Sequence, residues 1–145
     1  MRGMAFLLKH NLMGKLGAQM MVITVRGRKT NKPYSTPIGF LPFDDTTIIA
    51  LTNRNGESNW YRNIFAHPDV SLTIQGKTYS ARAEPVTDET ERQKIFELYK
   101  QERADTWKYL FDAPLTASET ELQAALAKRA FVKFHLDAPR AKQAA

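Results

Sequence analysis

The sequence predicts a mainly β domain of the α+β class, in which a small antiparallel barrel carries helices at its periphery. About six short runs of β-branched or alternating apolar residues, separated by turn residues, indicate strands. The connections have the length of hairpins rather than of crossovers, which favours antiparallel pairing. The 145 residues, 43% of them hydrophobic, contain no repeat or linker and suit a single domain, residues 1–145, with a substantial core.

The first element expected is a helix over residues 4–16, where apolar residues recur at intervals of four. Its polar face carries Lys9 and Lys15. We expect this helix to cover the core, and a basic amphipathic helix of this kind also suits peripheral contact with an acidic membrane.

Three strands are predicted next, over residues 20–25, 35–43 and 47–52, and they are expected to form an antiparallel meander. Asp44 and Asp45 lie in the tight turn between the last two strands. Two neighbouring carboxylates can serve catalysis, but in such a turn we expect them to accept hydrogen bonds from the backbone.

The remaining elements follow from capping and alternation. Ser58 or Asn59 is expected to cap a helix over residues 60–66, and two strands follow over residues 70–74 and 77–86. Two pairs with capping-box spacing open further helices, and residues 104–114 are expected to be irregular between them. A last strand is predicted over residues 130–136 and a frayed tail over residues 138–145. The capping pairs are Asp88 with Glu91 and Ser118 with Glu121.

The net charge of +6 is concentrated in the N-terminal third of the chain. Residues 1–43 hold seven basic residues and no acidic one, which predicts attraction of an anionic partner. The absence of cysteine excludes disulfides, a thiolate nucleophile and Cys-ligated metals, and it fits a cytoplasmic protein. No apolar run approaches the roughly 20 residues of a membrane span, and the N-terminal segment does not have the pattern of a signal peptide.

The most informative stretch is the basic turn, residues 26–32, which contains Arg26, Arg28, Lys29 and Lys32. Guanidinium and ammonium groups, followed by hydroxyls and free backbone N–H groups, suit the binding of a phosphate. The structural alternative, a solvated hairpin tip, is about equally compatible with the composition alone.

Motifs for self-sufficient catalysis are missing. The sequence contains no dinucleotide-binding glycine motif, no Walker A loop, no H-E-x-x-H and no G-x-S-x-G. His10, His67 and His135 fall on separate elements without the spacing of metal ligands, so we predict no metal site. An enzyme of this sequence therefore depends on a bound cofactor for its chemistry.

Two motifs resemble those of the deazaflavin-dependent nitroreductases. The members of this family are split-β-barrel oxidoreductases with an FMN-binding-like fold. The first is Gly27-Arg28-Lys29 followed by Thr36-Pro37. The second matches a Trp-Tyr-x-Asn-x-x-Ala-x-Pro-x-Val pattern with Trp60, Tyr61, Asn63, Ala66, Pro68 and Val70. The resemblance covers roughly residues 20–100 and implies a deazaflavin oxidoreductase that uses coenzyme F420.

The resemblance also implies the cofactor site. F420 carries a phosphodiester and an oligoglutamate tail, which suits the cations of the basic turn, while the loop after the strand 47–52 is expected to lie along the deazaflavin. Trp60 and Asn63 are expected to shape the wall and hold that loop, and Trp60 suits a core position as well. The implied cofactor-binding residues are Arg28, Lys29, Lys32, Ser35, Thr36, Pro37, Ile38, Thr52, Asn53, Arg54, Asn55, Trp60 and Asn63.

Two positions depart from the family pattern. Tyr34 stands where members often have Arg, so Lys32 or Arg54 is expected to compensate. Gly39 stands where some members carry an aromatic residue that faces the substrate, which opens the pocket. We expect Gly39, Trp107 and Tyr109 to form the substrate pocket, with residues 104–114 as one wall and no catalytic side chain. A satellite cluster of the core is an equally good interpretation of Trp107 and Tyr109.

The implied function is hydride transfer between F420 and a conjugated organic substrate such as a quinone, enone or nitro compound, by a monomer or a homodimer. Within the same fold the alternative is a barrel that binds FMN or haem. A basic nucleic-acid-binding module is a third and weaker alternative, because single-strand binders interleave aromatic residues with the charges.

Overall fold

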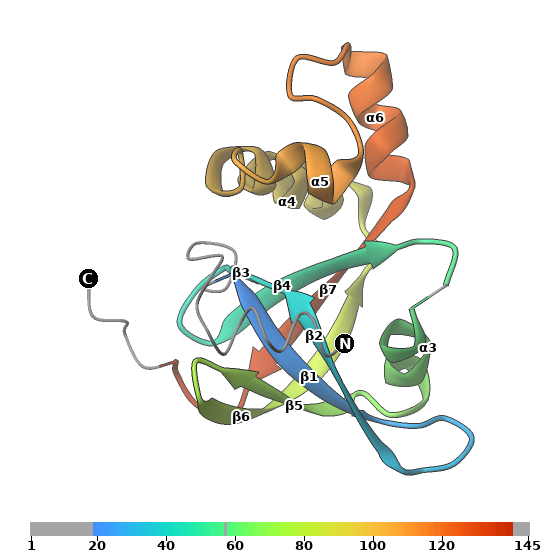
Figure 1. Cartoon of the computed structure of the whole chain (residues 1–145), viewed down its shortest axis with the longest axis vertical. Coiled ribbons are helices and arrows are strands. Elements are labelled where there is room, and N and C mark those ends of the chain that lie inside the picture. The colour runs from blue at the N-terminus through green and yellow to red at the C-terminus, as the bar shows by residue number, and fades with distance from the viewer. Residues whose placement is uncertain (1–18, 57, 141–145) are drawn as a thin grey trace.

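The structure of the protein is a computed structural model that describes residues 19–56 and 58–140 (Figure 1). The predicted helix 4–16 and the last residues of the tail lie outside this range. The elements are β1 (Met20–Arg26), β2 (Pro33–Gly39), β3 (Leu41–Pro42), β4 (Thr47–Asn53), α3 (Asn59–Ala66), β5 (Asp69–Ile74), β6 (Lys77–Val86), α4 (Glu89–Glu102), α5 (Trp107–Phe111), α6 (Glu119–Ala127) and β7 (Arg129–Leu136).

One seven-stranded antiparallel sheet forms the framework, with the strand order β2-β1-β5-β6-β7-β4-β3. The sheet curls, so that β2 at one end also contacts β4 near the other end. Figure 1 shows the resulting half-barrel, with α3 at one side and α4 to α6 stacked above it. The predicted mainly β barrel with peripheral helices is therefore confirmed.

The predicted meander is wrong, because β2 does not pair with β4. The expected strand over residues 35–43 is broken at Phe40, whose backbone N–H donates to the carbonyl of Gln19 at 2.8 Å. The side chains of Phe40 and Leu41 are buried in different hydrophobic clusters. The chain therefore crosses at Phe40 from one end of the sheet to the other, and the short strand β3 pairs with β4.

The core consists of two hydrophobic clusters on opposite faces of β4 and β7. Ile48 and Phe134 point into the barrel, whereas Ile49 and Phe131 point toward α4 to α6. This division follows from the alternation of side chains along a strand. Both strands are covered on both faces in their central parts, where apolar residues follow one another, as in Ile48-Ile49-Ala50-Leu51 and Ala130-Phe131-Val132.

The helix starts were largely predictable. The Asp88 side chain accepts a hydrogen bond from the Glu91 N–H, and Ser118 and Glu121 form a complete capping box. The expectation of an irregular segment over residues 104–114 is wrong, because it contains the one-turn helix α5. None of the helices in the described part of the chain is both long enough and apolar enough to cross a membrane.

Candidate functional site

The basic turn is held in a defined shape by its own backbone. The Gly27 N–H donates to the Lys32 carbonyl at 2.8 Å, and the Asn31 N–H donates to the Gly27 carbonyl at 2.9 Å. Asn31 has a φ of 61°, a left-handed conformation that asparagine tolerates better than most residues. A side chain at Gly27 would force its neighbour to move, because a Cβ there would lie 2.6 Å from Cε2 of Tyr34.

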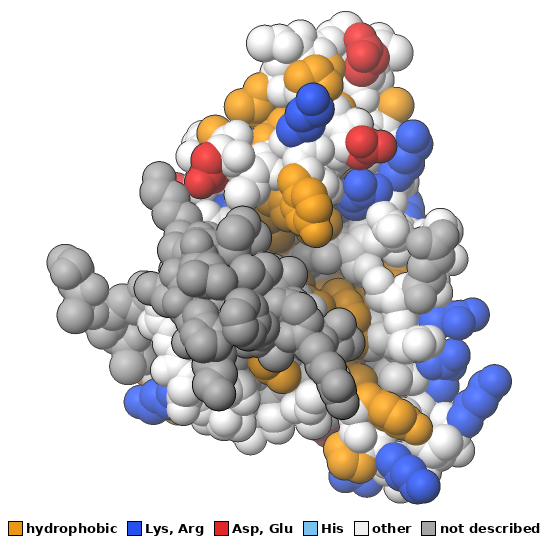
Figure 2. Space-filling view, viewed as in Figure 1, with side chains coloured by type: hydrophobic (Ala, Val, Ile, Leu, Met, Phe, Trp, Pro, Cys, Tyr) orange, Lys and Arg blue, Asp and Glu red, His pale blue; other side chains and the backbone are white. Residues whose placement is uncertain are grey.

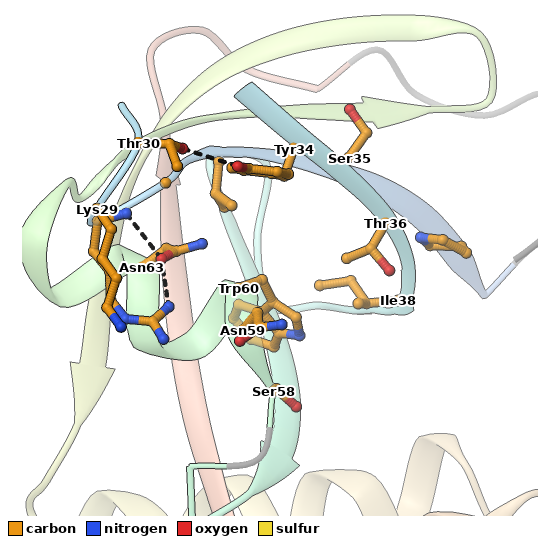
Figure 3. Close-up of a pocket in the computed structure, with 14 residues that line it drawn as sticks. Lys29, Thr30, Tyr34, Ser35, Thr36, Ile38, Ser58, Asn59, Trp60 and Asn63 are labelled. Atoms are coloured by element: carbon orange, nitrogen blue, oxygen red, sulfur yellow. Dashed lines mark hydrogen bonds between the residues drawn. The ribbon is translucent and has the colours of Figure 1, made fainter. Parts of the chain in front are cut away.

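A single buried amide joins this turn to α3. The side-chain oxygen Oδ1 of Asn63 accepts hydrogen bonds from the Arg28 backbone N–H at 3.0 Å and from Arg28 Nη1 at 2.8 Å (Figure 3). Asn63 is only 4% exposed, although Arg28 itself is exposed. The contact spans 35 residues of sequence and fixes where the basic turn sits relative to the helix.

The first cavity, of about 720 Å³, lies between β2, the basic turn and the start of α3. One end is charged and polar, with Arg28 and Lys29, while the indole of Trp60 and the side chain of Ile38 form an apolar region farther along (Figure 3). Such a gradient suits a ligand with an anionic end and a planar, less polar body. The cavity is lined by Val25, Gly27, Arg28, Lys29, Thr30, Tyr34, Ser35, Thr36, Pro37, Ile38, Ser58, Asn59, Trp60 and Asn63.

A second cavity, of about 310 Å³, adjoins the first and lies between the barrel and the helices. Four residues, Pro37, Ile38, Ser58 and Trp60, line both cavities. The two spaces are therefore neighbours, and we refer to them together as the trench, which extends from the basic turn past Trp60 to residues around α5. Figure 2 shows a hollow between the helical part and the barrel, with hydrophobic side chains around it and basic side chains along the neighbouring edge.

The lining of the second cavity is mostly apolar with one charged group. Phe40, Leu51 and Leu110 contribute hydrophobic surface, and Tyr109, which is 81% exposed, lies at the rim. Arg103 lines the same cavity, and its Nη2 donates to the carbonyl of Phe40 at 2.9 Å. Burial lowers the pKa of Arg103 below its ordinary value.

The structure brings most of the expected site residues to this trench. Eight of the expected cofactor-binding residues line the first cavity: Arg28, Lys29, Ser35, Thr36, Pro37, Ile38, Trp60 and Asn63. Thr52, expected with them, lines the second cavity together with Gly39 and Tyr109, which were expected at the substrate.

Four of the expected cofactor-binding residues line neither cavity. Lys32 is exposed on the turn, and Asn53, Arg54 and Asn55 lie beside the start of β7. Asn53 Oδ1 accepts a hydrogen bond from Arg129 Nη1 at 2.9 Å, and the Arg54 N–H donates to the Lys128 carbonyl. The loop is thus bonded to the start of β7, and Asn63 holds the basic turn rather than the loop.

Trp107 lies in the core, which was the alternative to a place in the substrate pocket. It is 1% exposed, its ring lies 4.3 Å from Phe111 and 4.9 Å from Phe96 between centroids, and it lines neither cavity. The structure therefore places Trp107 in the helical cluster of the core. Its helical neighbours Thr106, Tyr109 and Leu110 face the second cavity instead.

Several lining residues were not found from the sequence. Ser58 and Asn59 directly precede Trp60 and were assigned only to helix capping, yet Ser58 makes no side-chain cap and bonds to the Thr52 hydroxyl. Proximity to the Trp-Tyr motif was the available signal for both. The sequence did not indicate a role for Arg103, because 63 residues separate it from its hydrogen-bond partner Phe40.

The remaining candidates have structural roles. Asp44 Oδ1 accepts hydrogen bonds from the Thr46 N–H at 2.9 Å and its hydroxyl at 3.3 Å, and these bonds hold the pKa of Asp44 below its ordinary value. This confirms its expected turn role. His135 contacts Glu84 on the surface. No group of three potential metal-ligating side chains occurs among residues 19–56 and 58–140.

A family model for the F420H(2)-dependent quinone reductases matches residues 8–116, which is most of the chain. The chain belongs to this family. It is therefore an oxidoreductase whose cofactor is coenzyme F420, and this membership decides between F420 and the alternatives of FMN or haem. The resemblance found in the sequence is confirmed.

Solved structures show the same fold at low sequence identity. An F420-H2-dependent reductase, FDR-A, is 18% identical with a TM-score of 0.55, over 79% of this chain and 93% of that one. HutZ, the haem storage protein of Vibrio cholerae, is 11% identical with a TM-score of 0.59, over 90% and 91%. A general stress protein 26 relative of the pyridoxinephosphate oxidase family from Clostridium acetobutylicum is 10% identical with a TM-score of 0.58, over 92% and 85%. These structures support the split-barrel fold.

Proposed function

We propose that this quinone reductase family member binds F420 along the trench, with the anionic tail at the basic turn and the deazaflavin beside Trp60. The quinone-like substrate then occupies the second cavity. The observation that carries this proposal is that the charged cavity and the largely apolar cavity meet at Pro37, Ile38, Ser58 and Trp60. A ligand lying across this junction exposes one ring face to the second cavity.

The basic end of the trench fits the tail. Arg28 and Lys29 line the first cavity, and neither forms an ion pair with an acidic side chain among the described residues. One of the five side-chain N–H donors of Arg28 is bonded to Asn63, so the other four can bind a phosphate or carboxylate. Ser35 lies in the same wall, and its hydroxyl is bonded to the Thr24 hydroxyl at 2.7 Å.

The middle of the trench fits a planar ring. Trp60 is 6% exposed and is packed against Phe134 at 6.1 Å between centroids, so its indole forms a fixed wall. Pro37 and Ile38 form the facing apolar surface on β2. F420 supplies a hydride when it is bound in its reduced form. The residues around it orient the two reactants and exclude water, which is what hydride transfer requires.

The second cavity fits a conjugated acceptor. Its size lies at the lower end of typical small-molecule sites, which are about 300–1,000 Å³. Gly39 lines this cavity, and a Cβ there would meet only ordinary contacts, the nearest at 3.8 Å, so the glycine is not needed to relieve a clash. Tyr109 at the rim is placed to cover a bound ring. We therefore assign quinones and similar planar acceptors to this space.

The direct experiment is equilibrium titration of the purified protein with F420 and with FMN, followed by fluorescence, and then reduction of a quinone by reduced F420. We expect F420 to bind more tightly than FMN, because FMN has one phosphate and no glutamate tail. Quinone reduction should occur with reduced F420. FMN affinity equal to or greater than that for F420, or an absence of quinone reduction, would contradict the proposal.

A cytoplasmic location and a monomeric or homodimeric state complete the proposal. The cysteine-free sequence supports the location. Cell fractionation tests the location and sedimentation tests the assembly. Recovery of the protein in the membrane fraction would instead favour a peripheral role for residues 4–16.

A further inference from the structure

Arg103 is the charged residue of the second cavity, and the proposed function gives it no role. It directly follows the last residue of α4, and its side chain extends to Phe40, the residue between β2 and β3. Nη2 donates to the Phe40 carbonyl at 2.9 Å and Nη1 donates to the Glu102 carbonyl at 3.0 Å. These bonds anchor the guanidinium group at the cavity wall.

The anchoring leaves much of the guanidinium uncompensated. It has five N–H donors, of which two are used by these carbonyls. None of the ion pairs among the described residues includes Arg103. Tyr99, Glu102 and Asp105 lie near enough to favour its charged form, but Tyr99 is buried, and burial raises its pKa so that it stays neutral.

The carboxylates of Glu102 and Asp105 favour the charged form from a distance, but neither forms an ion pair with Arg103. Half-burial of a cation without such a direct ion pair is unfavourable. The surroundings add to this, because the side chains of Phe40, Leu51 and Leu110 in the cavity lining are apolar. An anionic oxygen inside the cavity would replace the water that burial removes from the guanidinium, because it accepts a charge-assisted hydrogen bond. The fork of an arginine is also suited to two oxygens in one plane, as in a carboxylate or in an enolate beside a carbonyl.

We propose that Arg103 makes the second cavity selective for planar conjugated acceptors that carry an anionic oxygen, such as hydroxyquinonates and quinone carboxylates. The inference rests on the proposed function, because it takes the second cavity as the substrate site. The aromatic body of the ligand lies on the apolar wall and its anionic oxygen binds Arg103. A neutral quinone of the same shape binds more weakly, because it leaves the cation uncompensated.

The test is calorimetric titration at pH 7 with two matched ligands, the anion of 2-hydroxy-1,4-naphthoquinone and the neutral 2-methyl-1,4-naphthoquinone. Both are titrated into the protein with and without F420. We expect the wild-type protein to prefer the anion by about tenfold or more, the range of a hydrogen bond to a charged group. Arg103→Gln should abolish this preference, and Arg103→Lys should retain part of it.

Two controls separate recognition from a purely structural role. Arg82→Gln removes an exposed cation on β6 that lines neither cavity, and it should leave the preference unchanged. Acidification that protonates the hydroxyquinone should also remove the preference in the wild-type protein. Thermal unfolding shows whether each variant is still folded without the Phe40 contact. If Arg103→Gln is unfolded, Arg103→Lys and the wild-type pH series still test the inference.

Equal affinity of the wild-type protein for the two ligands would overturn the inference, as would a preference that survives in Arg103→Gln. Because binding is measured without turnover, the result is independent of the proposed reaction. A protein that prefers the anion but reduces no quinone would refute the proposed function alone. A protein that reduces neutral quinones without any preference would refute the inference alone.

Discussion

The two ends of the trench handle charge in different ways. At the basic turn, Arg28 and Lys29 are exposed, and one buried amide, Asn63, fixes the position of the turn. At the helical end, a single half-buried cation, Arg103, lies among apolar side chains. Exposed cations attract a flexible anionic tail with little loss of solvation, whereas a half-buried cation discriminates strongly between charged and neutral ligands.

The largest expected effect is on stability, and it distinguishes Trp107 in the core from Tyr109 at the helical end of the trench. Trp107→Ala should lower the free energy of unfolding by about 3–5 kcal/mol, because it removes a buried aromatic side chain. Tyr109→Ala, two residues away on the exposed rim, should leave stability nearly unchanged and raise the Michaelis constant for the quinone. Denaturant unfolding and steady-state kinetics on both variants measure this. An unchanged Michaelis constant in Tyr109→Ala would remove that residue from the substrate pocket.

The next effect concerns the anchor of the basic turn. Asn63→Ala should lower stability by about 2–3 kcal/mol, because the Arg28 N–H and guanidinium lose a shared acceptor. It should also weaken F420 binding, since the turn is no longer fixed. Asn63→Asp keeps an acceptor but adds a negative charge, so it should retain more stability and still bind F420 poorly. If Asn63→Asp bound F420 as well as the wild type, the tail would not lie near this residue.

Single cations of the turn should have smaller effects. Arg28→Ala and Lys29→Ala should each weaken F420 binding by about 1–3 kcal/mol, as expected for hydrogen bonds to a charged group. Arg28→Ala should also lower stability, because Arg28 is bonded to Asn63, whereas Lys29→Ala should not. Lys94→Ala, an exposed lysine on α4, is the matched control for the loss of one charge. Unchanged F420 affinity in both turn variants, with folding intact, would contradict the assignment of the turn.

Salt should have the smallest effect and should act on one end of the trench only. Raising the salt concentration from about 0.05 M to about 0.5 M screens exposed charges, so F420 affinity should fall by less than about tenfold. The Michaelis constant of a neutral quinone should stay nearly constant over the same range. Titrations and kinetics at several salt concentrations test this contrast. If the Michaelis constant for the quinone changed as much as the F420 affinity, the two ends of the trench would not differ in their response to salt.

The parts of the fold that depend on local chemistry were predictable from the sequence. The basic turn between two strands, the cap at Asp88 and the capping box at Ser118 depend on neighbouring residues. The strand order was not predictable, because β2 and β3 are consecutive in sequence and lie at opposite ends of the sheet. The crossing is accompanied by the burial of Phe40 and Leu41 in different clusters, which depends on contacts between distant segments rather than on a local pattern.

The candidate site shows the same division. The residues on β2 and α3 were found because they lie within two short motifs. The loop at Asn53 lies outside both cavity linings, and its position depends on pairing with Arg129, which the sequence did not indicate. Trp107 and Tyr109 could not be told apart in the sequence, since the direction of each side chain is set by the packing of α5. Arg103 reaches the cavity only through a contact between distant segments.

The most direct test of the account compares F420 with a deazaflavin chromophore that lacks the phosphodiester and the glutamates. The affinity of each for the wild-type protein and for Lys29→Ala is measured by fluorescence titration. We predict that Lys29→Ala loses affinity for F420 by about 1–3 kcal/mol and binds the tail-less chromophore as the wild type does. Equal losses for both ligands would contradict the placement of the tail at the basic turn and of the ring beside Trp60.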